Sequence, residues 1–336
     1  MTTKDAPPAG DETALDLRGT VRLSDRARSI AREAGLVAVV IALVIGFGIA
    51  RPNFLSGDNM LAILLQASVV GILAIGQTFV LITGGIDLSI GSIVAVTAIC
   101  TGMLSHVVPA PLALIGGIAI GALSGAINGI LIAVTGITPF IVTLGTMSIY
   151  SGLALIISGG RAVYDIPQPF KDMLSGRLAG IPNPIIVVVV LTIASALVLK
   201  FTKFGEYLIA VGGNAETARL AGIKVKFIEA GSYVVSGAAA GLAGAILVSR
   251  LGAADPTIGG DLLLIAIAAT VMGGTKLTGG EGSMFGALIG AVLIAALTAG
   301  LTSLNVQAFY QQVAVGAAII IALLVDNIAR RGKRRA

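Results

Sequence analysis

The sequence predicts an all-α, polytopic membrane protein with about ten transmembrane helices. Of the 336 residues, 56% are hydrophobic and 12% are charged, and the mean hydropathy is +0.99. The apolar residues are collected in long runs, and short polar segments rich in Gly separate these runs. This composition excludes a soluble globular domain, because such a domain carries about twice as many charged residues.

The chain begins with a polar, cytoplasmic segment, 1–34, whose second half reads as a basic helix lying at the membrane surface. The first apolar run, 35–50, ends in small residues and resembles a signal peptide. We interpret it as an uncleaved span, because a long polar region precedes it and many further spans follow. The predicted transmembrane domain covers 35–328, and a basic cytoplasmic tail, 329–336, follows it. Nine further spans are predicted at 61–82, 90–108, 112–134, 138–158, 185–200, 228–249, 261–279, 284–301 and 308–326.

The distribution of positive charge sets the orientation of these spans. With the N-terminus inside, the outer loops hold only five of the 22 Lys and Arg residues: Arg51, Arg161, Lys171, Arg177 and Arg250. Cytoplasmic segments of membrane proteins carry an excess of Lys and Arg. We therefore expect both termini on the cytoplasmic side.

The longest predicted outer loop, 159–184, is rich in Pro and Gly and contains one short amphipathic piece around 169–178. It is interpreted either as a loop packed over the outer mouth or as a landing surface for a soluble binding protein. The single Cys100 excludes a disulfide within the chain and a cysteine-based metal site. We predict no metal site.

A polar segment, 204–225, interrupts the apolar runs and is the first candidate functional segment. Asn214 is a good N-cap and Gly222 a good residue after a helix end, so 215–221 reads as a short capped helix. Lys and Arg residues surround it, which places it on the cytoplasmic side. It is either an ordinary connection between two spans or an element that docks into a soluble partner.

Glycines at regular spacing predict close contacts between spans. Gly117, Gly121, Gly125 and Gly129 form a stripe on one span, and two further stripes contain Gly237, Gly241 and Ala245, and Gly286 and Gly290. Small residues let membrane helices approach closely where burial alone does not drive association. In addition, 84–92 weakly echoes 273–283, which predicts an internal repeat, with an inverted repeat as one possibility.

No Asp, Glu, Lys or Arg falls in the middle of a predicted span. Charged residues within spans commonly mark proton relays and charged-substrate sites, so their absence argues against both. Uncharged polar side chains are the candidates for a translocation path: Gln66, Gln77, Asn128, Thr143 and Asn305. The alternative for each is a hydrogen bond between helices.

The chain has none of the motifs that would supply its own chemistry. A phosphate-binding G-x-x-x-x-G-K-[ST] loop does not occur, nor do HExxH or GxSxG motifs. We therefore expect a transport subunit that is not an enzyme. If transport is active, another polypeptide must supply the energy.

Two motifs carry a resemblance to a known family. The segment GGNAETARLAGI at 212–223 resembles the cytoplasmic coupling loop of the ribose-, xylose- and arabinose-type permeases of bacterial ABC sugar importers, and GGIDLSIGSIV at 84–94 resembles their signature. The similarity covers roughly residue 34 to the C-terminus. The resemblance implies ATPase coupling through Asn214, Glu216, Thr217, Arg219 and Gly222, and structural signature roles for Gly84, Gly85, Asp87 and Ser89. Asp87 would lie at the cytoplasmic rim, as a helix cap, a structural pin or a contact to the ATPase.

The resemblance also implies the partners. These are an ABC ATPase subunit that binds ATP and Mg²⁺, a periplasmic or lipid-anchored sugar-binding protein, and a second permease copy in the bacterial inner membrane. No cofactor is expected in this chain. The substrate would be a neutral monosaccharide, such as a ribose-like pentose. A branched-chain amino-acid permease and a carrier independent of an ATPase are the alternatives.

Overall fold

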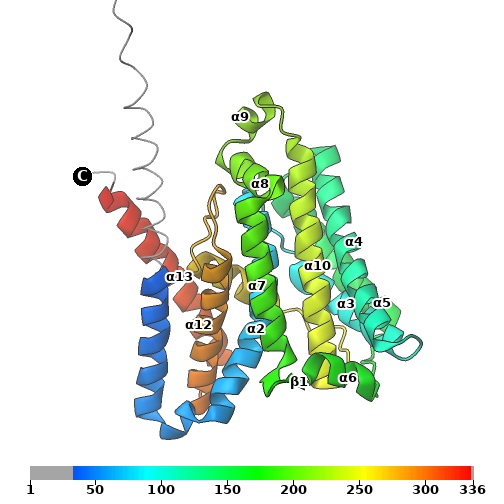
Figure 1. Ribbon diagram of the computed structural model, residues 1–336, viewed down its shortest axis with the longest axis vertical. Helices are drawn as coiled ribbons and strands as arrows, with labels where there is room; N and C mark the ends of the chain where they lie inside the picture. Colours follow the sequence, from blue (N-terminus) through cyan, green and yellow to red (C-terminus); the bar gives the residue numbers. More distant parts are fainter. Residues whose placement is uncertain (1–32, 334–336) are drawn as a thin grey trace, which may run out of the picture.

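The computed structural model describes residues 33–333, except for the side chains at 319, 321–323 and 325–333. Most of the predicted N-terminal segment, 1–34, and the last three residues of the predicted basic tail lie outside the described residues. The remainder forms an elongated bundle of helices (Figure 1). The fold is therefore all-α, as predicted, apart from one two-stranded hairpin.

A helix at Glu33–Ala50 opens the described chain, and the 3₁₀ helix η1 (Pro52–Leu55) follows it. The remaining elements are α2 (Gly57–Ile82), α3 (Ile90–Ser105), α4 (Ala110–Thr135), α5 (Pro139–Ser158), α6 (Gln168–Ser175), β1 (Arg177–Leu178), β2 (Ile181–Pro182), α7 (Asn183–Phe201), α8 (Lys203–Gly213), α9 (Ala215–Leu220), α10 (Val225–Leu251), α11 (Leu262–Met272), α12 (Met284–Ser303) and α13 (Ala308–Lys333).

Within the described residues, seven helices are long and apolar enough to cross a membrane: Glu33–Ala50, α2, α4, α5, α7, α10 and α12. Two predicted spans are shorter than expected. The span predicted at 90–108 is the 16-residue helix α3, and the span predicted at 261–279 is the 11-residue helix α11. At 1.5 Å per residue, α11 is only about 16 Å long, so it cannot cross the bilayer by itself.

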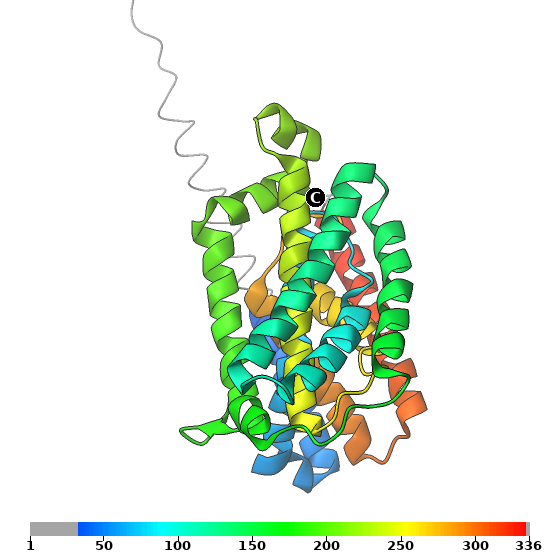
Figure 2. The same ribbon diagram turned by 90° about the vertical axis from the view of Figure 1, so that its right-hand side faces the viewer.

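The two ends of the bundle differ in character. The short helices α8 and α9 stand at one end, whereas α6, the β1–β2 hairpin and η1 lie at the other (Figures 1 and 2). The helix α6 occupies the amphipathic piece expected in the long loop, and it buries Phe170 and Leu174. The side chain of Glu33 accepts a hydrogen bond from Ser283, which precedes α12, so the described chain starts toward the α9 end.

The predicted glycine stripes form backbone contacts, as expected. A Cβ added at Gly121 or Gly125 on α4 would overlap a backbone carbonyl oxygen of α10, and a Cβ at Gly237 on α10 would overlap that of Gly121. The α4 and α10 backbones therefore touch along the stripe, which only glycine permits. The same applies to Gly290 on α12, where a Cβ would overlap the carbonyl oxygen of Ala269 on α11.

The two echoing segments, 84–92 and 273–283, lie against each other beside α8: a Cβ at Gly84 would meet the Thr278 carbonyl oxygen at 3.7 Å, and Gly279 lies against Gly212. Gly280 donates a backbone hydrogen bond of 2.8 Å to the carbonyl of Ile82, the last residue of α2. The contact brings the two echoing segments together, and the internal repeat, with an inverted repeat as one possibility, stays a prediction.

Candidate functional site

The first candidate site is the short helix α9, which projects beyond the rest of the bundle (Figures 1 and 2). The Asn214 side chain accepts a 2.8 Å hydrogen bond from the Thr217 N–H, which caps the start of the helix. At its end, Gly222 has a φ of +84° and donates to Arg219, while Ile223 donates to Ala218. This pair of backbone hydrogen bonds is the Schellman motif, so the predicted caps at both ends of the helix are confirmed.

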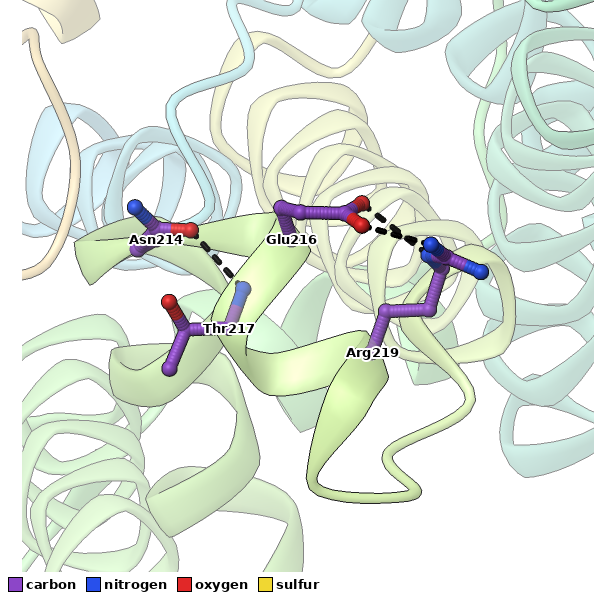
Figure 3. Close-up of polar contacts among 4 residues, drawn as sticks. All are labelled: Asn214, Glu216, Thr217 and Arg219. Carbon is purple, nitrogen blue, oxygen red and sulfur yellow. Dashed lines mark hydrogen bonds and ion pairs between the residues drawn. The ribbon is translucent and has the colours of Figure 1, made fainter.

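An ion pair occupies the exposed face of α9 (Figure 3). The Arg219 guanidinium donates to both carboxylate oxygens of Glu216, at 2.5 and 3.0 Å, and the two side chains are 65% and 64% exposed. This contact holds the pKa of the Glu216 carboxyl below its usual range. The charges of this pair therefore persist until the pH falls through that lowered pKa.

Two apolar side chains beside this pair were not predicted from the sequence. Leu220, the last residue of α9, and Phe227, in the first turn of α10, are each 76% exposed. An exposed apolar pair next to an exposed ion pair is typical of a protein-binding surface. Apolar residues are so common in this chain that the sequence offers no signal to single these two out.

The helix α9 is joined to the bundle through tight backbone contacts of α8. A Cβ at Gly212 would overlap the carbonyl oxygen of Ile82, and Gly279 and Gly280 lie against the backbone of Gly212 and Gly213. Phe204 at the start of α8 stacks on Phe79 of α2, with ring centroids 6.3 Å apart. The α8–α9 segment is therefore in direct backbone contact with the end of α2 and with the segment that precedes α12.

The second candidate site is a buried hydrogen-bond network around the signature residues. The Asp87 carboxylate accepts hydrogen bonds from the Ser89 hydroxyl and N–H at 2.7 and 3.0 Å, and from the Ser236 hydroxyl at 2.8 Å. Asn128 donates to the Ser89 hydroxyl at 2.7 Å. The network thus joins the segment between α2 and α3 to α4 and α10.

Asp87 lies deeper in the molecule than the sequence indicated. It is fully buried, and its partner Ser236 lies near the middle of α10. Gly84 has a φ of +84°, and a Cβ at Gly85 would press on the Tyr233 hydroxyl, so this segment enters the bundle through positions that favour glycine. Of the roles that the resemblance implies for Asp87, this burial favours the structural pin.

The structure does not gather all five residues predicted for a translocation path, although Asn128 and Thr143 both contact the segment around Asp87. Gln66 is exposed on α2, and Asn305 is exposed after α12 with a φ of +59°. Asn128 and Thr143 are buried, and Thr143 donates at 3.1 Å to the Ile86 carbonyl beside the network. None of the five lines either of two cavities that lie among the described residues, so their role in the path stays a prediction.

The fifth residue, Gln77, is fully buried on α2, and its amide has no hydrogen-bond partner among the described residues. An unsatisfied buried amide costs about 1–3 kcal/mol. We therefore expect Gln77→Leu to keep or raise the thermal midpoint of the purified protein. A lower midpoint would show that the amide has a partner in the folded protein, and unchanged uptake would remove Gln77 from the path.

Comparison with known proteins identifies relatives over most of the chain. The profile of the family described as "Branched-chain amino acid transport system / permease component" matches residues 59–323. The ribose import permease of Bacillus subtilis is 42% identical over 301 residues, which is 89% of this chain and 94% of the relative. The D-allose transport system permease of Escherichia coli is 38% identical, covering 87% of this chain and 90% of the relative.

A third relative, the L-arabinose ABC transporter permease of Azospirillum brasilense, is 36% identical over 307 residues, 90% of each chain. No solved structure matches this chain. The relatives named here all handle sugars, although the family description names branched-chain amino acids.

Proposed function

Because the chain belongs to this family of permeases, among the subunits of bacterial ABC sugar importers, we propose that it carries a neutral monosaccharide into the cell. It is a multi-pass protein of the inner membrane. The substrate class we propose is a ribose-like pentose or a related sugar. The names of the relatives and the scarcity of charge within the spans support this choice.

We further propose that a separate ATPase subunit binds ATP and Mg²⁺ and drives transport through α9. The observation that carries this proposal is the projecting helix itself, with exposed Glu216, Arg219, Leu220 and Phe227 on one end of the bundle. Its tight backbone connection to α2, through Gly212, supports a coupling role. Under this proposal the α9 end and both termini face the cytoplasm.

The remaining partners follow from the same proposal. A sugar-binding protein outside the cytoplasm would dock on the opposite end, where α6 and the β1–β2 hairpin lie. A second permease copy, most simply an identical one, would complete the pathway. The binding protein would supply most of the sugar selectivity, which suits a pathway without a strongly charged site.

Reversal of charge at Arg219 tests the coupling. In cells that hold the whole importer, Arg219→Glu should reduce sugar uptake at least about tenfold, which corresponds to roughly 1.4 kcal/mol of lost interaction. ATP hydrolysis should no longer respond to the sugar-loaded binding protein. The amount of assembled permease should be unchanged, because among the described residues the Arg219 side chain hydrogen-bonds to Glu216 on the same helix and is 65% exposed.

A charge swap separates docking from helix stability. The double variant Glu216→Arg with Arg219→Glu preserves the internal ion pair but reverses the charges that a partner meets. We expect it to remain uncoupled. If this double variant restored uptake, the pair would only stabilise α9, and the docking role would be refuted.

Two other functions remain to be tested against this one. A branched-chain amino-acid importer is favoured by the family description alone, and it predicts leucine uptake that depends on the ATPase. A carrier independent of an ATPase predicts sugar flux in vesicles that contain this chain alone. Sugar uptake that requires both the ATPase and this chain would exclude both alternatives.

A further inference from the structure

Two helices, α3 and α11, begin in the middle of the bundle and not at one of its ends. The segment 83–89 precedes α3, and the segment 253–261 precedes α11, and neither segment is helical. Their depth follows from their contacts with α10. The hydrogen bond from Ser236 to Asp87 and the packing of Gly244 against Thr97 place the start of α3 beside the middle of α10.

The starts of these two helices meet. A Cβ at Gly91 would overlap the carbonyl oxygen of Gly259, and a Cβ at Gly259 would overlap that of Gly91. At membrane depth, non-helical backbone is tolerated only where it is buried in protein or lines a water-filled cavity. The segment 253–261 therefore requires such surroundings.

A cavity of about 360 Å³ lies against this junction. Its lining comes from three places: the start of α3, the outward part of α5, and the segment before and into α11. The polar side chains among them are Ser92, Ser151 and Thr257. None of the described residues that line it is ionisable.

A second cavity, of about 540 Å³, continues the first toward the end that carries α6. Leu155, Pro256 and Thr257 line both cavities, so the two lie directly beside each other. The outer cavity is bounded by Arg161, Tyr164 and Asp255. Val163 and Ala254 hold this mouth together through two backbone hydrogen bonds of 2.8 Å.

From this geometry we propose that the two cavities form an outward-facing half-channel for an uncharged polyol, which ends where Gly91 meets Gly259. The inference rests on the proposed sugar-import function and assigns its path to residues other than the five predicted from the sequence. The Ser92 and Thr257 hydroxyls already donate to the Ser89 carbonyl and to the Asp255 carboxylate, so they can accept hydrogen bonds from sugar hydroxyls. The Ser151 hydroxyl can donate and accept. A neutral lining of this kind does not hold the sugar tightly, and the charged groups stay at the mouth.

Cysteine accessibility tests the half-channel. In the complete importer with Cys100 replaced by alanine, Ser151→Cys should react from outside with a charged methanethiosulfonate reagent, which modifies thiols only where water reaches them. The matched control is Ser148→Cys, on the same span one turn away, which is as accessible as Ser151 in the chain alone but lines neither cavity and would therefore face the membrane rather than the half-channel. We expect at least a tenfold slower reaction at Ser148→Cys. Equal rates at the two positions would overturn the proposal.

Protection by ligand tests the class of substrate. In the presence of the sugar-loaded binding protein and ATP, a mixture of D-ribose, D-allose and L-arabinose should slow the reaction at Ser151→Cys, whereas leucine should not. Protection by leucine alone would overturn the polyol assignment. If leucine alone protects Ser151→Cys and the cells also take up leucine, the proposed function is refuted as well. Uptake is therefore measured in the same cells.

A bulky side chain provides a second measurement. Ser151→Trp should reduce uptake at least about tenfold while assembly is retained, and Ser148→Trp should leave uptake near normal. If Ser151→Trp transports sugar normally in an importer that is otherwise active, the half-channel does not run past Ser151, and the proposal fails while the proposed function stands.

Discussion

Gly121→Leu should prevent the protein from folding. A Cβ at this position already overlaps the Gly237 carbonyl oxygen and comes within 2.9 Å of the Gly241 nitrogen, so the leucine has no space to occupy. Overpacking costs about 1–3 kcal/mol where neighbouring side chains can move aside. Here the obstacle is the backbone of α10, so α4 and α10 must separate over several turns. The measurement is the yield of monodisperse protein in detergent and its thermal midpoint.

Gly145→Leu is the matched control for this experiment. Gly145 lies within α5, another apolar helix, and a Cβ added there meets no atom within 4 Å. This variant should be produced at the normal level with an unchanged midpoint. A stable and active Gly121→Leu protein would contradict the contact between α4 and α10.

Asp87→Leu should have the next largest effect. The change removes the acceptor for the Ser89 N–H and hydroxyl and for the Ser236 hydroxyl, all of which are buried. Each buried donor left without a partner costs about 1–3 kcal/mol. We therefore expect a large fall in the thermal midpoint and loss of uptake, because α3 is no longer attached to α10 at this depth.

Asp87→Asn distinguishes a requirement for the hydrogen bonds at this position from a requirement for its negative charge. The asparagine oxygen can still accept from Ser89, and its amide group can donate to the Ser236 hydroxyl. We expect near-normal stability and uptake. If Asp87→Asn behaves like Asp87→Leu, the negative charge itself is required. Asp58→Leu, at the exposed start of α2, should change neither property and serves as the control.

Local features of the fold were predictable because their causes lie within a few neighbouring residues. Most spans, the capped helix at α9 and the glycine stripe of α4 each depend on a periodicity or on a cap within one segment. The glycine stripe also implied a close partner helix, although the sequence did not identify α10 as that partner. The two short helices were overestimated in length because Val107 and Val108 extend the apolar run beyond α3, and because no local signal distinguishes the turn at Gly273 and Gly274 from a continuation of α11.

The candidate sites were predictable to different degrees. The exposed pair of Glu216 and Arg219 lies within one turn of helix, so the motif and the geometry agree. The contact from Asp87 to Ser236 joins residues 149 positions apart, and no local pattern encodes it. The cavity residues Ser92, Ser151 and Thr257 are small hydroxyl residues of a kind found throughout the chain, so nothing in the sequence distinguishes them.

The amino-acid sequence by itself determined that this chain is an α-helical membrane protein, where most spans lie and which short helix projects from them. The free energy of transferring a segment into the bilayer depends on that segment alone, and so does a helix cap. Only the tertiary structure decided that two helices break in the middle of the bundle, that Asp87 is buried there and that a neutral cavity lies beside the break. These features depend on backbones approaching each other across distant parts of the chain, which packing alone determines.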